Sequence, residues 1–143
     1  MRFVPRGQQV RDPDDDTFKG IVGTAFSIRP VDKGGLSLTW IEHYGPKSIA
    51  TCSVAASKFR DSLSSKKLGG QAYFAIGQAG TIKEVAANYG KQIRLVHAPD
   101  GPNTGHVELR RFTDEDRGLM DALALDVFTE HIAVADLNLT PVS

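Results

Sequence analysis

The chain has little of what would tie it to an oxidising compartment or to a membrane. Cys52 is its only cysteine, so no disulfide bond can form within the chain. The first residues, from Met1 to Gly7, lack the apolar run of a secretory signal. No window approaches the roughly 18 consecutive apolar residues that are needed to cross a bilayer. We therefore expect a cytoplasmic protein without a membrane partner.

The chain also lacks an excess of charge of either sign. Its 17 lysines and arginines balance 17 aspartates and glutamates, which leaves no overall field to attract DNA or RNA. The nearest local basic cluster is equally typical of an ordinary solvated surface, and it consists of Lys58, Arg60, Lys66 and Lys67. We do not expect a nucleic acid partner.

Glycine-rich phosphate loops and internal repeats are missing as well. Neither GxGxxG nor GxxxxGK[ST] occurs, so no nucleotide cofactor is predicted. The acidic stretch from Asp12 to Asp16 lacks the spaced ligands and central glycine of a calcium-binding loop. The sequence therefore predicts no cofactor and no metal site.

The length and composition are those of one small globular domain. The chain has 143 residues, of which 41% are hydrophobic and 8% aromatic, enough for a single core. Residues 1–20 are charged and contain prolines, so we expect a flexible charged arm followed by one domain over residues 21–143. These features are also typical of small bacterial accessory proteins.

Hydrophobic spacing predicts the first half of the domain. Apolar residues alternate over 22–28 and again over 36–40, which favours two strands that form a hairpin about Gly34 and Gly35. From Thr51 the spacing changes to three and four residues, which indicates a helix that ends before Gly69. Residues 72–76 read as a short strand.

The second half carries the remaining helices. Thr81 and Glu84 fit a capping box for a short helix that reaches Tyr89, although a strand over the same residues stays open as an alternative. Residues 93–97 and 106–111 read as paired strands, and Thr113 is expected to cap a long helix that reaches Phe128. The prediction is an α+β fold: a mostly antiparallel sheet with the central and C-terminal helices on one face.

The paired strands need one common apolar face, and this limits their register. Pairing Leu95 with Val107 keeps that face, points His97 to it and turns His106 to the other side. The same register sets Arg94 opposite Glu108 as a cross-strand ion pair. His97, His106 and Glu108 then cannot converge on one metal ion.

The loop between these strands is the densest group of chemically capable residues. His43 ends a separate strand close to two aromatic residues and a turn, in a position where loops often bind ligands. Our leading hypothesis is a binding module, without catalysis, that recognises a protein or a small molecule through the 97–106 loop. Its candidate ligand-binding residues are His43, His97, Asn103, His106 and Glu108.

Cys52 supports a second hypothesis, a cysteine hydrolase. A thiol in the first turn of a helix is placed where the helix dipole favours thiolate, and His97 or His106 could act as its base. Such an enzyme would have the Cys-His geometry of papain-like hydrolases. The oligomeric state stays open under both hypotheses.

Two short motifs resemble the cysteine-peptidase pattern of NlpC/P60 cell-wall hydrolases. They are Thr51-Cys52-Ser53 at a helix start and Gly105-His106-Val107 on a later strand. The resemblance implies a Cys-His pair, but Thr51 replaces the family's acidic residue and the glycine expected after the cysteine is missing. An exported wall-cleaving enzyme would also conflict with the expected cytoplasmic location.

Overall fold

The computed structural model describes residues 1–28 and 35–142. In this part of the chain, short strands alternate with helices in an α+β fold, as the sequence predicts. The strands are β1 (Arg2–Val4), β2 (Gln9–Arg11), β3 (Phe18–Ile21), β4 (Leu36–Thr39), β5 (Tyr73–Ile76), β6 (Arg94–His97), β7 (His106–Arg110) and β8 (Glu130–Ala133). The α-helices are α1 (Ile49–Ser62), α2 (Ala79–Asn88) and α3 (Arg117–Ala122). Shorter helical turns are η1 (Arg6–Gln8), η2 (Gly23–Phe26), η3 (Ile41–Tyr44), the π-helical η4 (Leu123–Val127) and η5 (Val134–Asp136).

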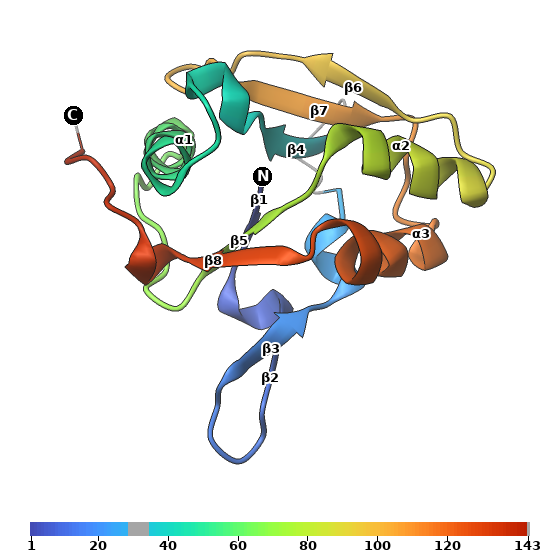
Figure 1. Cartoon of the computed structure of the whole chain (residues 1–143), viewed down its shortest axis with the longest axis horizontal. Coiled ribbons are helices and arrows are strands. Elements are labelled where there is room, and N and C mark those ends of the chain that lie inside the picture. The colour runs from blue at the N-terminus through green and yellow to red at the C-terminus, as the bar shows by residue number, and fades with distance from the viewer. Residues whose placement is uncertain (29–34, 143) are drawn as a thin grey trace.

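The described strands form three antiparallel sheets rather than one continuous sheet. The β1-β5-β8 sheet crosses the middle of Figure 1 and the β4-β7-β6 sheet lies above it. The backbones of Met1 and Thr39 join the two sheets, since each nitrogen donates a hydrogen bond to the other residue's carbonyl, at 2.8 and 2.9 Å. The edges of β1 and β4 are therefore held together.

Two hydrophobic clusters occupy opposite sides of the domain. Helix α1 lies on the left in Figure 1, and its Phe59 packs against Phe3 and Phe74 of the middle sheet with ring centroids 5.3 and 5.8 Å apart. The other cluster joins buried residues of α2, α3 and the upper sheet, and in it Phe26 and Phe128 lie 4.9 Å apart. The helices therefore cover more than one face.

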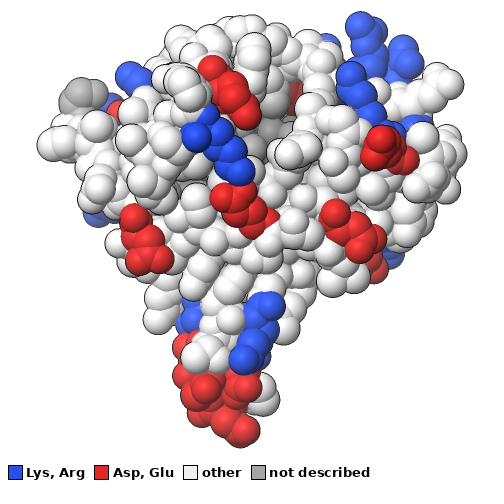
Figure 2. Space-filling model, viewed as in Figure 1, with Lys and Arg blue, Asp and Glu red and all other residues white. Residues whose placement is uncertain are grey.

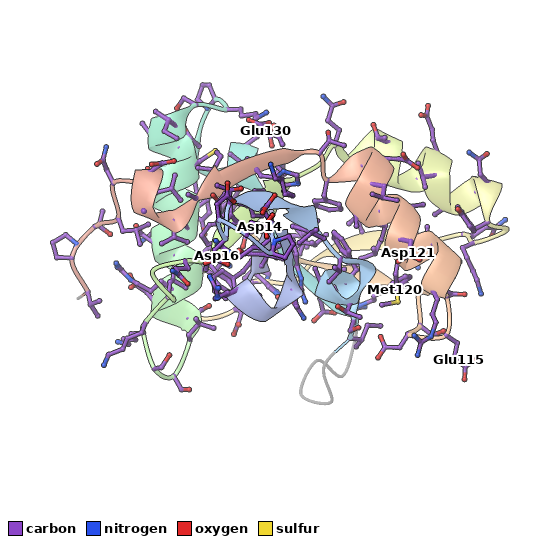
Figure 3. The ribbon with its side chains drawn as sticks, turned by 90° about the horizontal axis from the view of Figure 1, so that it is seen from below. Asp14, Asp16, Glu115, Met120, Asp121 and Glu130 are labelled. Carbon is purple, nitrogen blue, oxygen red and sulfur yellow. The ribbon has the colours of Figure 1, made fainter. Side chains whose placement is uncertain are left out.

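Residues 1–20 contribute directly to this packing instead of preceding the domain as a loose arm. β1 pairs along its length with β5, and Val4 is fully buried. β2 and β3 form a hairpin that projects downward in Figure 1, and its tip carries the acidic residues seen in Figure 2. Figure 3 looks toward that tip from below, with Asp14 and Asp16 labelled, and Arg6 pairs with Asp16 at 2.8 Å. The charged composition thus belongs to an ordered hairpin tip.

The strand expected over residues 22–28 is wrong. Gly23–Phe26 forms the 3-10 turn η2, in which the consecutive residues Ala25 and Phe26 are both fully buried. A strand with one solvated face cannot bury two successive side chains, because they point to opposite sides. The strand expected from Leu36 is confirmed as β4, but its partner is β7. Gly34 of the expected hairpin turn lies outside the described residues.

The helices confirm their predicted existence but not all of their predicted ends. Ser48 caps α1 by accepting a 3.1 Å hydrogen bond from the Thr51 nitrogen. α2 is a helix and not a strand, but Gln78 precedes it and Thr81 lies inside it, so the predicted capping box is wrong. None of the helices in the described ranges has both the length and the apolar character needed to span a bilayer.

The C-terminal helix starts later than predicted. Residues 113–116 form a turn in which the Asp116 carboxylate accepts a 3.1 Å hydrogen bond from the Thr113 nitrogen, and α3 begins at Arg117. Thr113 is therefore not the cap, because Asp116 occupies the N-cap position and Thr113 lies three residues before it. The helix continues through η4 to Val127, and Phe128, the predicted last residue, is its C-cap.

Candidate functional site

The β6-β7 hairpin carries most of the residues singled out in the sequence. Its register pairs Leu95 with Leu109 and Arg94 with Arg110, so the predicted pairing is two residues off. The predicted ion pair of Arg94 with Glu108 is consequently wrong, and Glu108 instead accepts a 2.9 Å hydrogen bond from the neighbouring Arg110. The alternation of side chains determines which face of the sheet each residue points to, but a shift of two residues keeps the same faces. The turn between the strands then sets the register.

The loop between β6 and β7 is held by its own backbone. The Ala98 nitrogen donates to the His106 carbonyl at 2.9 Å. Asp100 and Asn103 exchange backbone hydrogen bonds of 3.1 and 2.9 Å. A loop closed in this way presents a fixed set of side chains.

Asn103 fastens this loop to the rest of the domain. The side chain is 1% exposed, its Nδ2 donates to Thr39 Oγ1 at 3.0 Å, and its Oδ1 accepts from Tyr44 Oη at 2.8 Å. Tyr44 Oη in turn accepts a 2.9 Å hydrogen bond from the Gly105 nitrogen. Asn103 thus uses its amide internally, and its role in this geometry is to position the loop.

Three exposed rings meet beside the loop: Trp40, His43 and His97. Their centroids are 5.7 Å apart for Trp40 and His43, 6.0 Å for Trp40 and His97, and 5.4 Å for the two histidines. Thr104 bonds both imidazoles, with its Oγ1 at 3.0 Å from His43 Nε2 and its carbonyl at 2.7 Å from His97 Nε2. Because a carbonyl only accepts, His97 Nε2 carries a proton, and Nδ1 has no hydrogen-bond partner among the described residues.

His106 faces the other way, as the predicted side-chain parity requires. Its Nδ1 donates to the Ala98 carbonyl at 2.5 Å, and its Nε2 accepts from Ser37 Oγ at 2.7 Å. Both ring nitrogens of this buried histidine are therefore occupied. Glu108 lies two residues further along β7 and shares that side of the sheet.

Cys52 lies on the buried face of α1, in the core, and is 1% exposed. Burial raises the pKa of its thiol, with a further contribution from the negative charge of Glu130. In the described part of the chain the thiol forms no hydrogen bond with a histidine, and no group of three potential metal ligands occurs. This environment favours the neutral thiol, whereas a nucleophilic cysteine requires the thiolate.

A pocket of about 520 Å³ opens beside the ring trio. It lies where the two sheets, η3 and the start of α2 meet, and Figure 2 shows a hollow in the upper half of this face. Its wall is mostly apolar, with polar groups at the rim. The lining residues are Met1, Leu38, Thr39, Trp40, Ile41, Glu42, Lys47, Ile76, Gly77, Gln78, Ala79, Ile82, Lys83, Leu95, His97, Val107 and Phe128.

The pocket includes only part of the predicted set. His97 lines it, and His43 touches two of the rings at its rim, whereas Asn103, His106 and Glu108 lie outside the lining. The side contributed by α2 was missed, because its residues looked like an ordinary amphipathic helix. The polar residues of that side, Gln78 and Lys83, carried no motif that could have identified them.

Comparisons with known proteins relate this chain to no family. A scan against protein-family models, a search of curated proteins and a search of solved structures each found no match. The functional argument therefore depends on the geometry of the site alone.

Proposed function

We propose that this protein is a binding module that takes a small ligand in the pocket at the foot of the 97–106 loop. The observation that carries the proposal is the pocket itself, whose volume of about 520 Å³ lies within the range of small-molecule sites. An apolar wall with a few polar groups at the rim is typical of such sites. A concave site of this size favours a small molecule over a protein partner.

The exposed ring of Trp40 supports the same proposal. Trp40 is 47% exposed although its neighbours Thr39 and Ile41 are buried, so a large apolar surface is left in water at the pocket rim. Covering such a surface is favourable, at about 25 cal/mol for each Å² of apolar area removed from water. We expect the ligand to lie against this ring and beside His97.

Trp40 is the only tryptophan in the chain, so its fluorescence reports directly on the pocket. Octanol is a suitable neutral probe, because it is apolar and does not absorb where tryptophan is excited. We expect a saturable shift of the emission as octanol is added. Ala79→Phe, a change at an exposed residue of the pocket wall, should weaken binding roughly tenfold or more by filling the site, equivalent to about 1.4 kcal/mol.

Ala87→Phe is the matched control, since Ala87 is also exposed on α2 but does not line the pocket. This variant should bind octanol like the unmodified protein. Absence of a saturable shift, or equal binding by the Ala79→Phe variant, would contradict the proposed function.

A further inference from the structure

The charges around the pocket do not balance one another. Three charged side chains line it: Glu42, Lys47 and Lys83. Lys47 forms an ion pair with Glu130, and that bond raises the pKa of Lys47. Glu42 interacts electrostatically with the amino group of Met1. Lys47 is therefore compensated by Glu130. Burial lowers the pKa of the Met1 amino group to about 5, so near pH 7 this group compensates little of the Glu42 charge, which belongs to η3.

Lys83 is different, because it has no hydrogen bond and no ion pair within residues 1–28 and 35–142. It is exposed, and it shares the pocket wall with Ala79, four residues earlier on α2. Side chains on a helix lean toward its N-terminus, so the lysine extends over the turn that begins at the pocket. The α2 side of the rim therefore carries a positive charge without a partner among the described residues.

The start of α2 adds to this positive character. Gln78 precedes the helix without a side-chain cap, and the first turn contains no acidic residue. The positive end of the helix dipole thus points to the same side of the pocket as Lys83, where an anion is stabilised. Beneath it the wall is apolar, with Leu38, Ile82 and Val107 among its residues.

We infer that the pocket binds an amphipathic organic anion, a carboxylate whose apolar body fills the cavity and whose charged group lies against Lys83. The inference rests on the proposed function and adds the chemical class of the ligand. An apolar body is held by the removal of its surface from water, and the carboxylate is held by charge complementarity at one rim. A neutral molecule of the same shape gains only the first contribution.

Octanoate, octanol and octylamine share one apolar chain and differ in the charge of the head group, so they test this inference. With Trp40 fluorescence as the readout, we expect octanoate to bind roughly fivefold more tightly than octanol, in line with an exposed ion pair beside a helix terminus. Octylamine should bind more weakly than octanol. The preference for octanoate should decrease as salt is added, because the charges are exposed.

Lys83→Gln should abolish the preference, so that octanoate no longer binds more tightly than octanol, and Lys83→Glu should reverse the preference toward octylamine. A purely structural role of Lys83 would not reverse a charge preference. Lys58→Gln is the matched control, because Lys58 is exposed on α1 and does not line the pocket. That variant should keep the preference.

The outcomes separate the inference from the proposed function. If octanol binds and Ala79→Phe weakens its binding, but octanoate binds no better than octanol, the proposed binding pocket is supported. The inference that its ligand is an anion is then wrong. A preference that survives Lys83→Gln also overturns the inference. If neither probe binds, the proposed function and the inference fail together.

Discussion

The side chain of Asn103 offers the sharpest test of how the site is held. It is buried and joins three parts of the fold: the 97–106 loop, β4 through Thr39, and η3 through Tyr44. Asn103→Ala removes both hydrogen bonds and leaves the Tyr44 hydroxyl and the Thr39 hydroxyl without this partner. We therefore expect the substitution to destabilise the protein and to loosen the loop.

The magnitude follows from the number of bonds that are lost. Each hydrogen bond contributes about 0.5–1.5 kcal/mol, and a buried polar group left unsatisfied costs about 1–3 kcal/mol. Water entering the vacated space would offset part of this cost, so we expect a loss of about 2–4 kcal/mol in the free energy of unfolding. That is a large part of the roughly 5–15 kcal/mol typical of a small domain.

Urea unfolding followed by circular dichroism measures this loss. With a typical slope of about 2 kcal/mol per molar urea, the midpoint should fall by about 1–2 M. Asn138→Ala is the control, because Asn138 is exposed and its side chain forms no hydrogen bond with the described residues, while its backbone nitrogen bonds Ser53. A double-mutant cycle with Tyr44→Phe should show a coupling of about 1 kcal/mol, as expected for groups in direct contact.

A loss below about 0.5 kcal/mol for Asn103→Ala would refute this reasoning, since that is the range of ordinary surface substitutions. Additive effects of the Asn103 and Tyr44 substitutions would also contradict it. In either case the loop would have to be held by its backbone bonds alone.

Two further predictions concern groups whose pKa the fold shifts. Burial raises the pKa of the Cys52 thiol. We therefore expect iodoacetamide to modify the folded protein far more slowly than the urea-unfolded chain across pH 7–9. Rapid modification with an apparent pKa below about 8.5 would instead support the cysteine hydrolase. The hydrogen bond from Lys91 lowers the pKa of the Asp116 carboxyl group. The pair therefore stabilises the fold fully above the carboxyl pKa of the unfolded chain, about 3.9. This stabilisation is lost as the pH falls through the lowered pKa of the folded protein. Lys91→Gln should therefore cost about 0.2–1 kcal/mol at pH 7 and nothing at the acid end, and a cost that does not depend on pH would exclude this explanation.

Hydrophobic periodicity predicted the helices and strands that present one continuous apolar face to a core. The helix around Cys52 and the strands around Leu95 and Leu109 each present one apolar stripe or face to a core, so their sequence spacing was sufficient. Residues 22–28 failed because the alternation there coincides with a turn that buries neighbouring side chains. Charge misled the interpretation of residues 1–20, in which β1 is buried by strands far along the sequence.

The sequence allowed us to predict site residues in the 97–106 loop and at His43, but not the pocket residues on the other elements. His43 and His97 stood out because histidines near turns are chemically versatile, and the fold brings their rings together. Lys83 and Ile82 belong to the same pocket because the fold places α2 beside residues of two sheets. Such long-range packing leaves no local signal, so spacing within the sequence cannot reveal it.

The pairing of β1 has a consequence for the order in which a nascent chain can fold. Arg2 pairs with Ala75 of β5, and β5 needs β8 on its other edge, so the middle sheet closes only after residue 133 has been made. Until then β5 has one open strand edge, which is prone to pair with other chains. Pairings between such distant residues also slow folding, since the entropy of closing long loops is lost first. Folding of the domain therefore cannot be completed before β8 has been synthesised.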